Sequence, residues 1–210
     1  VYGFYSKLAG RAIARIAETQ FDRPVTMVEV GAGTGNGTLN VLDRTSHFER
    51  YVVTDVSKAL VQRGRRRIKK LGHDFFEYRD LDISGDLAAQ DMAAGQADIV
   101  LAVNVLHATN DLVPALRNAK KLLAPGGWFV IAEIAPPADS IYRYMELTFG
   151  LLNSYSKYDD PQLRPTGAIV RADSWFEALK AAEFTAFDAI PGDRAEGLDR
   201  GGLVIARADG

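Results

Sequence analysis

VTMVEVGAGTGNGT, residues 25–38, joins a strand-like run to a glycine-rich turn and then to a helix-like segment. Residues 25–30 predict a strand, and residues 37–45 predict the helix that follows it. Three alternating glycines stand between them, and glycine lets a backbone turn sharply and approach a ligand closely. This order predicts the first unit of an α/β fold, with a tight turn where the strand ends.

Strand-like and helix-like patterns alternate along most of the chain, which favours a parallel, doubly wound sheet. The segment ADIVLAVNVLHATND, residues 97–111, begins with an apolar run that has no alternation, as a central strand covered on both faces would have. Strands are expected at 25–30, 50–54, 74–79, 98–103 and 128–133. Helices are expected at 5–18, 37–45, 57–70, 86–93, 111–123, 139–152 and 173–182.

The end of the chain breaks this alternation. Residues 185–192 and 201–208 predict two strands with no helix between them, and therefore an antiparallel hairpin at one edge of the sheet. Pro125-Gly126-Gly127 predicts a turn between a helix and the fifth strand. The expected fold class is α/β, with a mostly parallel seven-stranded sheet and an antiparallel C-terminal hairpin.

Composition narrows the function classes. The 210 residues suit one domain, 1–210, and 47% of them are hydrophobic, which is typical of a globular protein. A net charge of −2 gives no general attraction to nucleic acid or to anionic membranes. The absence of cysteine excludes disulfides and thiol chemistry, and it favours a cytoplasmic protein. Neither a membrane span nor a signal peptide is predicted, and the start at Val1 suggests a piece of a longer protein.

The glycine turn lacks the features of a phosphate site. The dinucleotide fingerprint G-x-G-x-x-G requires a glycine where this chain has Asn36 or Thr38, depending on the frame, and there is no Walker Gly-Lys-Ser/Thr. Glu29 lies two residues ahead of Gly31, and a carboxylate beside the turn suits a positively charged ligand. S-adenosylmethionine has an ammonium group, a sulfonium and no phosphate, so it fits. The alternative is a purely structural turn.

Two further acids follow the next strands. Asp55 stands 20 residues after Gly35, the interval at which an acid meets a ribose diol in nucleotide-binding α/β folds. Asp82 follows the third strand, where an adenine amino group would reach it. Either acid alone is also a candidate helix N-cap, and Asp55 directly precedes a predicted helix. With Glu29 they place acids at three successive strand ends, which capping does not predict.

His107, one of 3 histidines, lies just beyond the predicted fourth strand. Glu133 ends the fifth strand, which neighbours the fourth in this topology. We expect the two side chains to meet, with the carboxylate fixing the tautomer of an imidazole that acts as general base near neutral pH. The alternative is that His107 caps a helix or bonds a backbone carbonyl. His47 and His73 are expected at the surface, and no residue cluster has metal-ligand spacing.

These residues resemble motifs of the class I S-adenosylmethionine-dependent methyltransferases, and most closely the methyltransferase domains of polyketide synthases. The resemblance covers about residues 25–185. It rests on VEVGAGTGNGT, VVTDVSKA, LDIS, NVLHATND, LRNAKKLLAPGGWFVIAE and ELTFGLL. It implies a Rossmann-like fold and a catalytic pair, His107 with Glu133. The cofactor residues that it implies are Glu29, Gly31, Gly33, Gly35, Asp55, Asp82, Ile83, Asn104 and Val105. The helix within residues 1–20 would be the remnant of an upstream lid.

One departure from the family pattern bears on the substrate. C-methylating domains are expected to show Gly-Trp-Trp after the FGLL segment, whereas this chain has NSYSKY at 153–158. C-methylation of the α-carbon of a β-ketoacyl thioester is the favoured reaction. O-methylation of a β-hydroxyl or enol on the same kind of chain is the first alternative. An inactive, cofactor-binding scaffold domain in a synthase is the second.

The resemblance also implies partners. The acyl substrate would be tethered to an acyl carrier protein, and neighbouring synthase domains would surround this one. Phe149, Tyr155 and Tyr158 are the expected substrate contacts. The basic run at residues 63–70 predicts a solvated helix face, with docking of an acidic carrier protein as the functional alternative.

Overall fold

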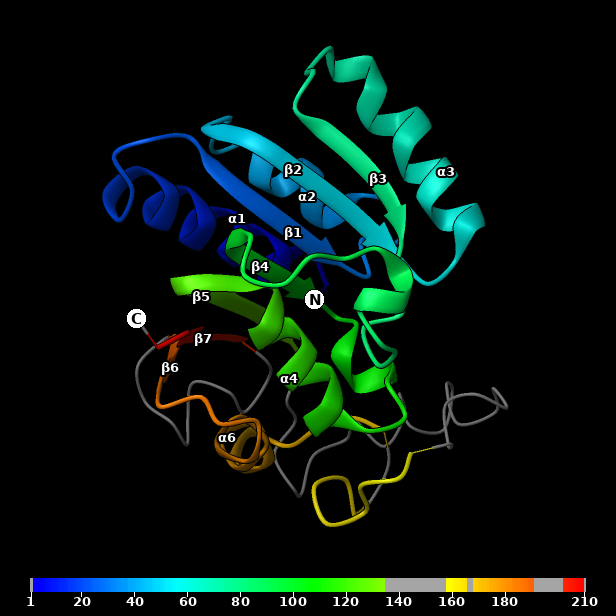
Figure 1. Ribbon diagram of the computed structural model, residues 1–210, viewed down its shortest axis with the longest axis vertical. Coiled ribbons are helices and arrows are strands. Elements are labelled where there is room, and N and C mark those ends of the chain that lie inside the picture. The colour runs from blue at the N-terminus through cyan, green and yellow to red at the C-terminus, as the bar shows by residue number, and fades with distance from the viewer. Residues whose placement is uncertain (1, 135–157, 166–167, 191–201, 210) are drawn as a thin grey trace.

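A computed structural model describes residues 2–134, 158–165, 168–190 and 202–209 of the chain. Its seven-stranded sheet has the order β3-β2-β1-β4-β5-β7-β6. The first five strands pair in parallel, and β7 runs antiparallel to both β5 and β6 (Figure 1). The strands are β1 (Val25–Val30), β2 (Phe48–Asp55), β3 (Phe76–Asp80), β4 (Ala97–Val103), β5 (Leu123–Glu133), β6 (Ala186–Ile190) and β7 (Gly202–Arg207). The predicted fold class and the C-terminal hairpin are confirmed.

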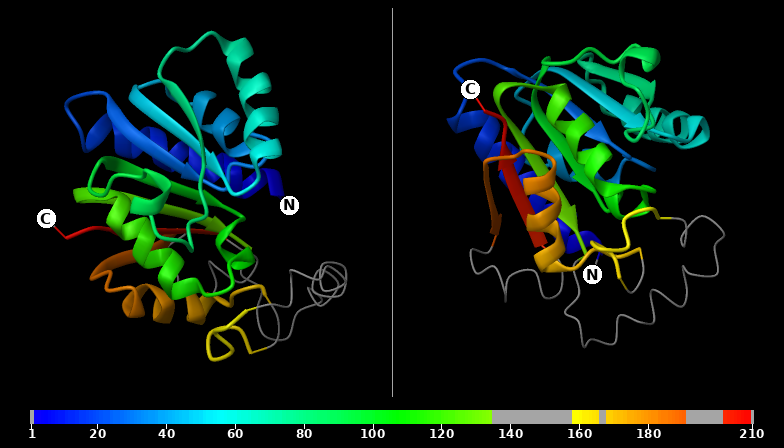
Figure 2. Two further views of the ribbon diagram at one scale, coloured as in Figure 1. Left: turned by 45° about the vertical axis from the view of Figure 1, so that its right-hand side comes forward. Right: turned by 60° about the horizontal axis from the view of Figure 1, so that its bottom comes forward.

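Helices cover both faces of this sheet. One core layer packs α1 and α2 against the sheet, and the other packs α4 and α6 on the opposite face (Figures 1 and 2). The α-helices are α1 (Tyr2–Thr19), α2 (Asn36–Leu42), α3 (Lys58–Ile68), α4 (Leu112–Leu122) and α6 (Ala172–Ala181). The 3-10 turns are η1 (Lys69–Leu71), η2 (Ala88–Gln90) and η3 (Leu106–Ala108). No helix among the described residues is both long and apolar enough to cross a bilayer.

The central position of β4 in the sheet explains why apolar and polar residues do not alternate in its sequence. The strand lies between β1 and β5, and its residues 97–102 are all buried because one layer of helices covers each face. Val100 and Ala102 belong to the core layer of α4, whereas Ile99 and Leu101 belong to the layer of α1. Since β1, β4 and β5 are parallel neighbours, their carboxyl ends meet at one edge of the sheet. That edge holds the functional residues described below.

Two local predictions were wrong. The helix expected at 86–93 is only the short turn η2, because the chain enters the left-handed region at Asp91 (φ 55°) and stops the helix there. The turn expected at Pro125-Gly126-Gly127 lies inside β5, which begins directly after α4. Ala97 pairs with Leu123 and Ile99 pairs with Trp128, so the residues of β5 between these pairs make its pairing with β4 irregular. The helix predicted at 139–152 lies outside the described residues.

Candidate active site

The glycine turn between β1 and α2 is shaped by close contacts. Gly31 has φ +62°, and a Cβ built on it would lie 2.0 Å from Cγ2 of Val105, so only glycine fits there. Gly33 also has a positive φ, and its amide donates a 2.9 Å hydrogen bond to Oδ2 of Asp55. The amide of Gly35 donates to the carbonyl of Ala32 and closes the turn. The turn is therefore fixed against the ends of both β2 and β4.

Asp55 holds the end of β2 in place. Its Oδ1 accepts a hydrogen bond from the amide of Ser57 while its Oδ2 accepts from Gly33. The N-cap of α3 is Ser57, whose hydroxyl accepts from the amide of Leu60, so the capping alternative for Asp55 is wrong. Each carboxylate oxygen keeps a second lone pair. Both oxygens can therefore accept a ligand hydroxyl in addition to these backbone bonds.

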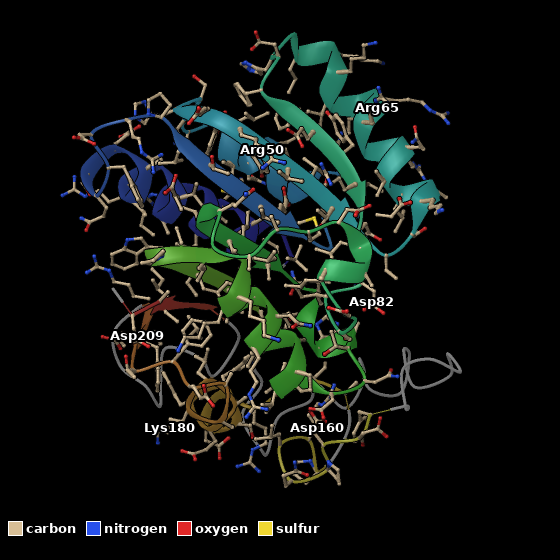
Figure 3. The ribbon with its side chains drawn as sticks, viewed as in Figure 1. Arg50, Arg65, Asp82, Asp160, Lys180 and Asp209 are labelled. Carbon is tan, nitrogen blue, oxygen red and sulfur yellow. The ribbon has the colours of Figure 1, made fainter. Side chains whose placement is uncertain are left out.

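A cavity of about 270 Å³ lies beside this turn. It is lined by the ends of β1 and β2, by residues 81–84 and by residues of the segment 105–110. Asp82 is exposed on its rim, beyond the end of β3 (Figure 3). No basic side chain is among the described residues that line it. Two carboxylates without a cation suit a ligand that donates hydrogen bonds, such as an uncharged nucleoside, and do not suit a phosphate.

The carboxylate of Glu29 is buried between β1, α2 and β2. Glu29 is 1% exposed, beneath the turn, and its Oε2 accepts hydrogen bonds from the Thr38 hydroxyl at 2.6 Å and the Tyr51 hydroxyl at 2.5 Å. Burial raises the pKa of Glu29, and these two hydrogen bonds only partly offset the effect. Burial, together with the Glu29 charge, also raises the pKa of Tyr51 far above its usual value. Glu29 therefore binds β1 to α2 and β2, and it does not line the cavity.

The residue that follows β4 has a left-handed backbone. Asn104 adopts φ +49°, a conformation that is uncommon for residues other than glycine and that asparagine enters more readily than most. Its Oδ1 is buried, and no described residue donates a hydrogen bond to it. A buried acceptor without a donor is costly unless a ligand supplies one. Val105, the next residue, contacts Gly31 and lines the cavity.

His107 and Glu133 meet as predicted. The distance from Nδ1 of His107 to Oε2 of Glu133 is 2.8 Å, and their side chains are 22% and 3% exposed. The other oxygen, Oε1, accepts from the amides of Val105 and Leu106 at 2.9 and 2.8 Å. The carboxylate therefore fixes both the η3 turn and the imidazole that it presents.

This geometry decides the tautomer of the imidazole. A carboxylate at Nδ1 keeps a proton on that nitrogen, so Nε2 has the lone pair and can act as a base. The negative charge at 2.8 Å also stabilises the imidazolium that forms when Nε2 takes up a proton. Among the described residues, no three His, Cys, Asp or Glu side chains lie close enough together to hold a metal ion.

Comparison with known proteins identifies the family. A family model described as "Methyltransferase domain" matches residues 28–129. The solved structure of the CurJ carbon methyltransferase superposes with a TM-score of 0.86 at 28% identity over 98% of this chain. The chain belongs to the class I S-adenosylmethionine-dependent methyltransferases. The trans-methyltransferase CalH, solved in complex with SAH, is similar at 31% identity with a TM-score of 0.80, again over 98% of this chain.

The relatives also show where such a methyltransferase occurs. Polyketide synthase ThaQ of Burkholderia thailandensis is 34% identical over 206 residues, 96% of this chain. The chain spans only 10% of the length of ThaQ, 54% of the CurJ chain and 58% of the CalH chain. This methyltransferase is therefore similar to one part of each of these proteins.

The predicted cofactor and catalytic residues of the methyltransferase divide into two groups. Five of them line the cavity directly: Gly31, Asp55, Asp82, Ile83 and Val105. The others are not part of this lining. Glu29, Gly33 and Gly35 form hydrogen bonds in or beneath the glycine turn, Asn104 follows β4, and His107 pairs with Glu133. Phe149 and Tyr155 lie outside the described residues. Tyr158 is half-buried, with its ring 5.0 Å from the Arg164 guanidinium, and it is not among the cavity residues.

Several residues that shape the site were missed by the sequence analysis. Thr38 and Tyr51 hold the buried carboxylate of Glu29, and a Cβ on Gly37 would lie 2.3 Å from its Oε1. The spacing Glu29-x8-Thr38 was visible, but no local pattern indicates that Tyr51, on another strand, completes the cluster. Arg164, which donates to carbonyls of the His107 loop, and Asp160, which pairs with Arg164, had no sequence signal at all.

We expect Gly31→Ala to weaken cofactor binding at least tenfold. The added methyl group would overlap Val105, so the cavity wall must shift, and the positive φ adds strain. Gly72→Ala is the matched control, because Gly72 has φ +77° but a Cβ added to it would meet no atom within 4 Å. Isothermal titration with S-adenosylhomocysteine measures both dissociation constants. Equal affinity in the two variants would contradict the close-packing argument.

Proposed function

We propose that this methyltransferase transfers a methyl group to the α-carbon of a β-ketoacyl thioester tethered to a carrier protein. The observation that carries the proposal is the 2.8 Å contact of the buried Glu133 with His107, whose neighbours Val105 and Ala108 line the cavity. An α-carbon between two carbonyls is acidic enough for an imidazole base. The similarity to CurJ, described as a carbon methyltransferase, supports carbon as the acceptor.

The cavity residues fit S-adenosylmethionine. Asp55 would accept from the ribose hydroxyls, and Asp82 from the adenine amino group, while the glycine turn would contact the methionine part. Asn104 Oδ1, buried without a donor among the described residues, would accept from an ammonium group. When bound, the cofactor supplies an electrophilic methyl group on a sulfonium.

The protein residues supply the proton transfer. Nε2 of His107 removes one α-proton from the β-ketoacyl thioester, and the electron pair of the C–H bond becomes that of an enolate. The imidazolium stays paired with Glu133 and later releases the proton to solvent. General-base assistance of this kind contributes roughly 10²–10⁴-fold to a rate.

O-methylation is the competing reaction, and one feature of the chain favours it. The segment NSYSKY at 153–158 stands where Gly-Trp-Trp is expected in C-methylating domains. His107 would serve that reaction too, by taking the proton of a β-hydroxyl or enol as the methyl group arrives. A scaffold domain that binds the cofactor without turnover is the remaining alternative.

One assay distinguishes these functions. Carrier-bound β-ketoacyl and β-hydroxyacyl chains are offered with isotope-labelled cofactor, and mass spectrometry locates the new methyl group. We expect label on the α-carbon of the β-keto chain. Methyl on oxygen alone would replace the proposal with O-methylation, and no transfer to either chain would favour the scaffold.

The basic surface of α3 and the following turn η1 supports an acidic partner. Arg63, Arg66, Arg67, Lys69 and Lys70 line an open depression of about 830 Å³ beside Thr34 of the glycine turn. All five cations are exposed, so they attract a negatively charged surface by long-range electrostatics that salt screens. We propose that an acidic carrier protein docks there.

We expect the double substitution Arg63→Glu/Arg66→Glu to raise KM for the carrier-bound substrate about tenfold. The value of kcat, and KM for a small thioester without a carrier, should change less than twofold. Arg11→Glu/Arg15→Glu, on the exposed part of α1, makes the same charge change elsewhere. An unchanged KM would leave the α3 cations as a solvated face.

A further inference from the structure

Arg164 lies buried behind the loop that presents His107. Its side chain is 0% exposed, and every nitrogen of the guanidinium makes a hydrogen bond. Nη1 donates to the backbone carbonyls of His107 at 3.0 Å and Thr109 at 2.9 Å, and Nη2 donates to that of Asn110 at 2.9 Å. One side chain thus donates hydrogen bonds to three of the four backbone carbonyls of residues 107–110.

Asp160 completes this arrangement. Its Oδ1 accepts from Nε of Arg164 at 2.5 Å, and its Oδ2 accepts from the amide of Leu112, the first residue of α4, at 2.9 Å. The amide of Asp159 donates to the carbonyl of Asn110 at 2.7 Å. Figure 3 shows Asp160 in the segment next to the N-terminal end of α4. We call residues 105–110, which include His107, the catalytic loop. The segment 158–165 therefore binds the end of this loop to the start of the core helix α4.

The catalytic loop is held from two sides. Glu133 accepts from the amides of Val105 and Leu106 at its start, and Arg164 donates to the carbonyls at its end. These contacts span the single 3-10 turn η3, which by itself fixes few backbone angles. Both side chains therefore fix the backbone that presents the imidazole of His107, because neither end of the loop can turn without losing hydrogen bonds to a buried side chain.

We propose that Arg164 is a positioning residue for catalysis, which with Asp160 holds His107 in the orientation that keeps Nδ1 on Glu133. The proposal rests on the proposed role of His107 as the base. A guanidinium is required because its planar fork reaches three carbonyls and a carboxylate at once, which a lysine ammonium cannot do. The buried charge is neutralised by Asp160, which is 1% exposed.

The first test is the kinetics of Arg164→Lys in the intact chain. We expect kcat to fall about tenfold, because the lysine keeps the charge but loses most of the carbonyl contacts. In a His107→Ala background the same substitution should lower the residual rate less than twofold, since Arg164 acts through that imidazole. Asp160→Asn is the second variant, for the case in which Arg164→Lys does not fold, and we expect it to lower kcat in the same way.

Arg23→Lys is the matched control. Arg23 makes two 2.8 Å hydrogen bonds to Asp98, at the start of β4 and thus at the opposite edge of the sheet from His107. Its replacement should leave kcat within twofold of the parent value. An equal loss of kcat in Arg23→Lys and Arg164→Lys, or an equal effect of Arg164→Lys with and without His107, would overturn the proposal in favour of a general role in stability.

Nitrogen NMR of histidine-labelled protein separates this proposal from the proposed function. In the parent chain we expect the His107 ring to have its proton on Nδ1, and in Arg164→Lys to show a mixture of tautomers. Unchanged ring signals in Arg164→Lys would overturn the positioning role. If His107→Ala kept full turnover while the ring signals of Arg164→Lys changed, the base assignment would fail and the positioning of the ring would stand.

Discussion

His107→Ala should lower kcat for carbon methylation by at least about 100-fold while leaving the affinity for the cofactor unchanged. The substitution removes Nε2 of the imidazole, the group that the proposed function assigns as the base. The cavity wall is unaffected, because His107 is not among the residues that line it. Steady-state kinetics and titration with S-adenosylhomocysteine measure the two quantities on the same preparation.

His73→Ala is the control for this prediction. His73 is exposed and precedes β3, so it lies at the other end of the sheet. Its replacement should change neither quantity. Turnover of His107→Ala within tenfold of the parent value would refute the assignment of the base.

Glu133→Gln should lower kcat nearly as much as His107→Ala, although it replaces only one side-chain oxygen with an NH2 group. Oε1 receives two backbone amides, so the oxygen of glutamine must stay there, and its NH2 group then faces Nδ1 of His107. An NH2 donor at Nδ1 forces the ring proton onto Nε2, which removes the base. A comparable carboxylate-to-amide change in serine proteases lowers kcat by roughly 10⁴, and we expect a loss of about 10²–10⁴ here.

The folded state should tolerate this change, since the hydrogen bonds to Val105 and Leu106 remain. Thermal unfolding and cofactor affinity are therefore expected to stay close to those of Glu77→Gln, a control that loses an ion pair with Arg50 far from the site. Combining Glu133→Gln with His107→Ala should cost no more turnover than His107→Ala alone. Retention of a tenth of kcat in Glu133→Gln would contradict the tautomer argument.

Much of the fold follows from local sequence patterns. The apolar run of β4 predicted a central strand because its burial on both faces removes any need for alternation. The failures came where a single backbone conformation decides the structure. The left-handed Asp91 ends a segment with helical spacing, and Gly126, with φ 75°, lies in an irregular part of β5 that looks like a turn in sequence.

The sequence predicted which site residues lie close together where the ends of neighbouring strands determine their positions. His107 and Glu133 come from neighbouring parallel strands, so topology alone brings them together. The direction of each side chain was not predictable. Glu29 is bound by the hydroxyls of Thr38 on α2 and Tyr51 on β2, and it is not among the described residues that line the cavity. Arg164 is 57 residues from His107 and acts on backbone carbonyls, which leave no trace in the sequence.

Hydrogen exchange at the α-carbon is the most direct measurement of the central claim, that Glu133 holds His107 as the base for enolate formation. A β-ketoacyl thioester is incubated in deuterium oxide with the protein and S-adenosylhomocysteine, so no methyl group can be transferred. NMR then follows the loss of the α-protons above the rate in buffer. We expect the parent chain to exchange them at least tenfold faster than either His107→Ala or Glu133→Gln. Equal exchange in all three proteins, alongside normal carbon methylation by the parent, would contradict it.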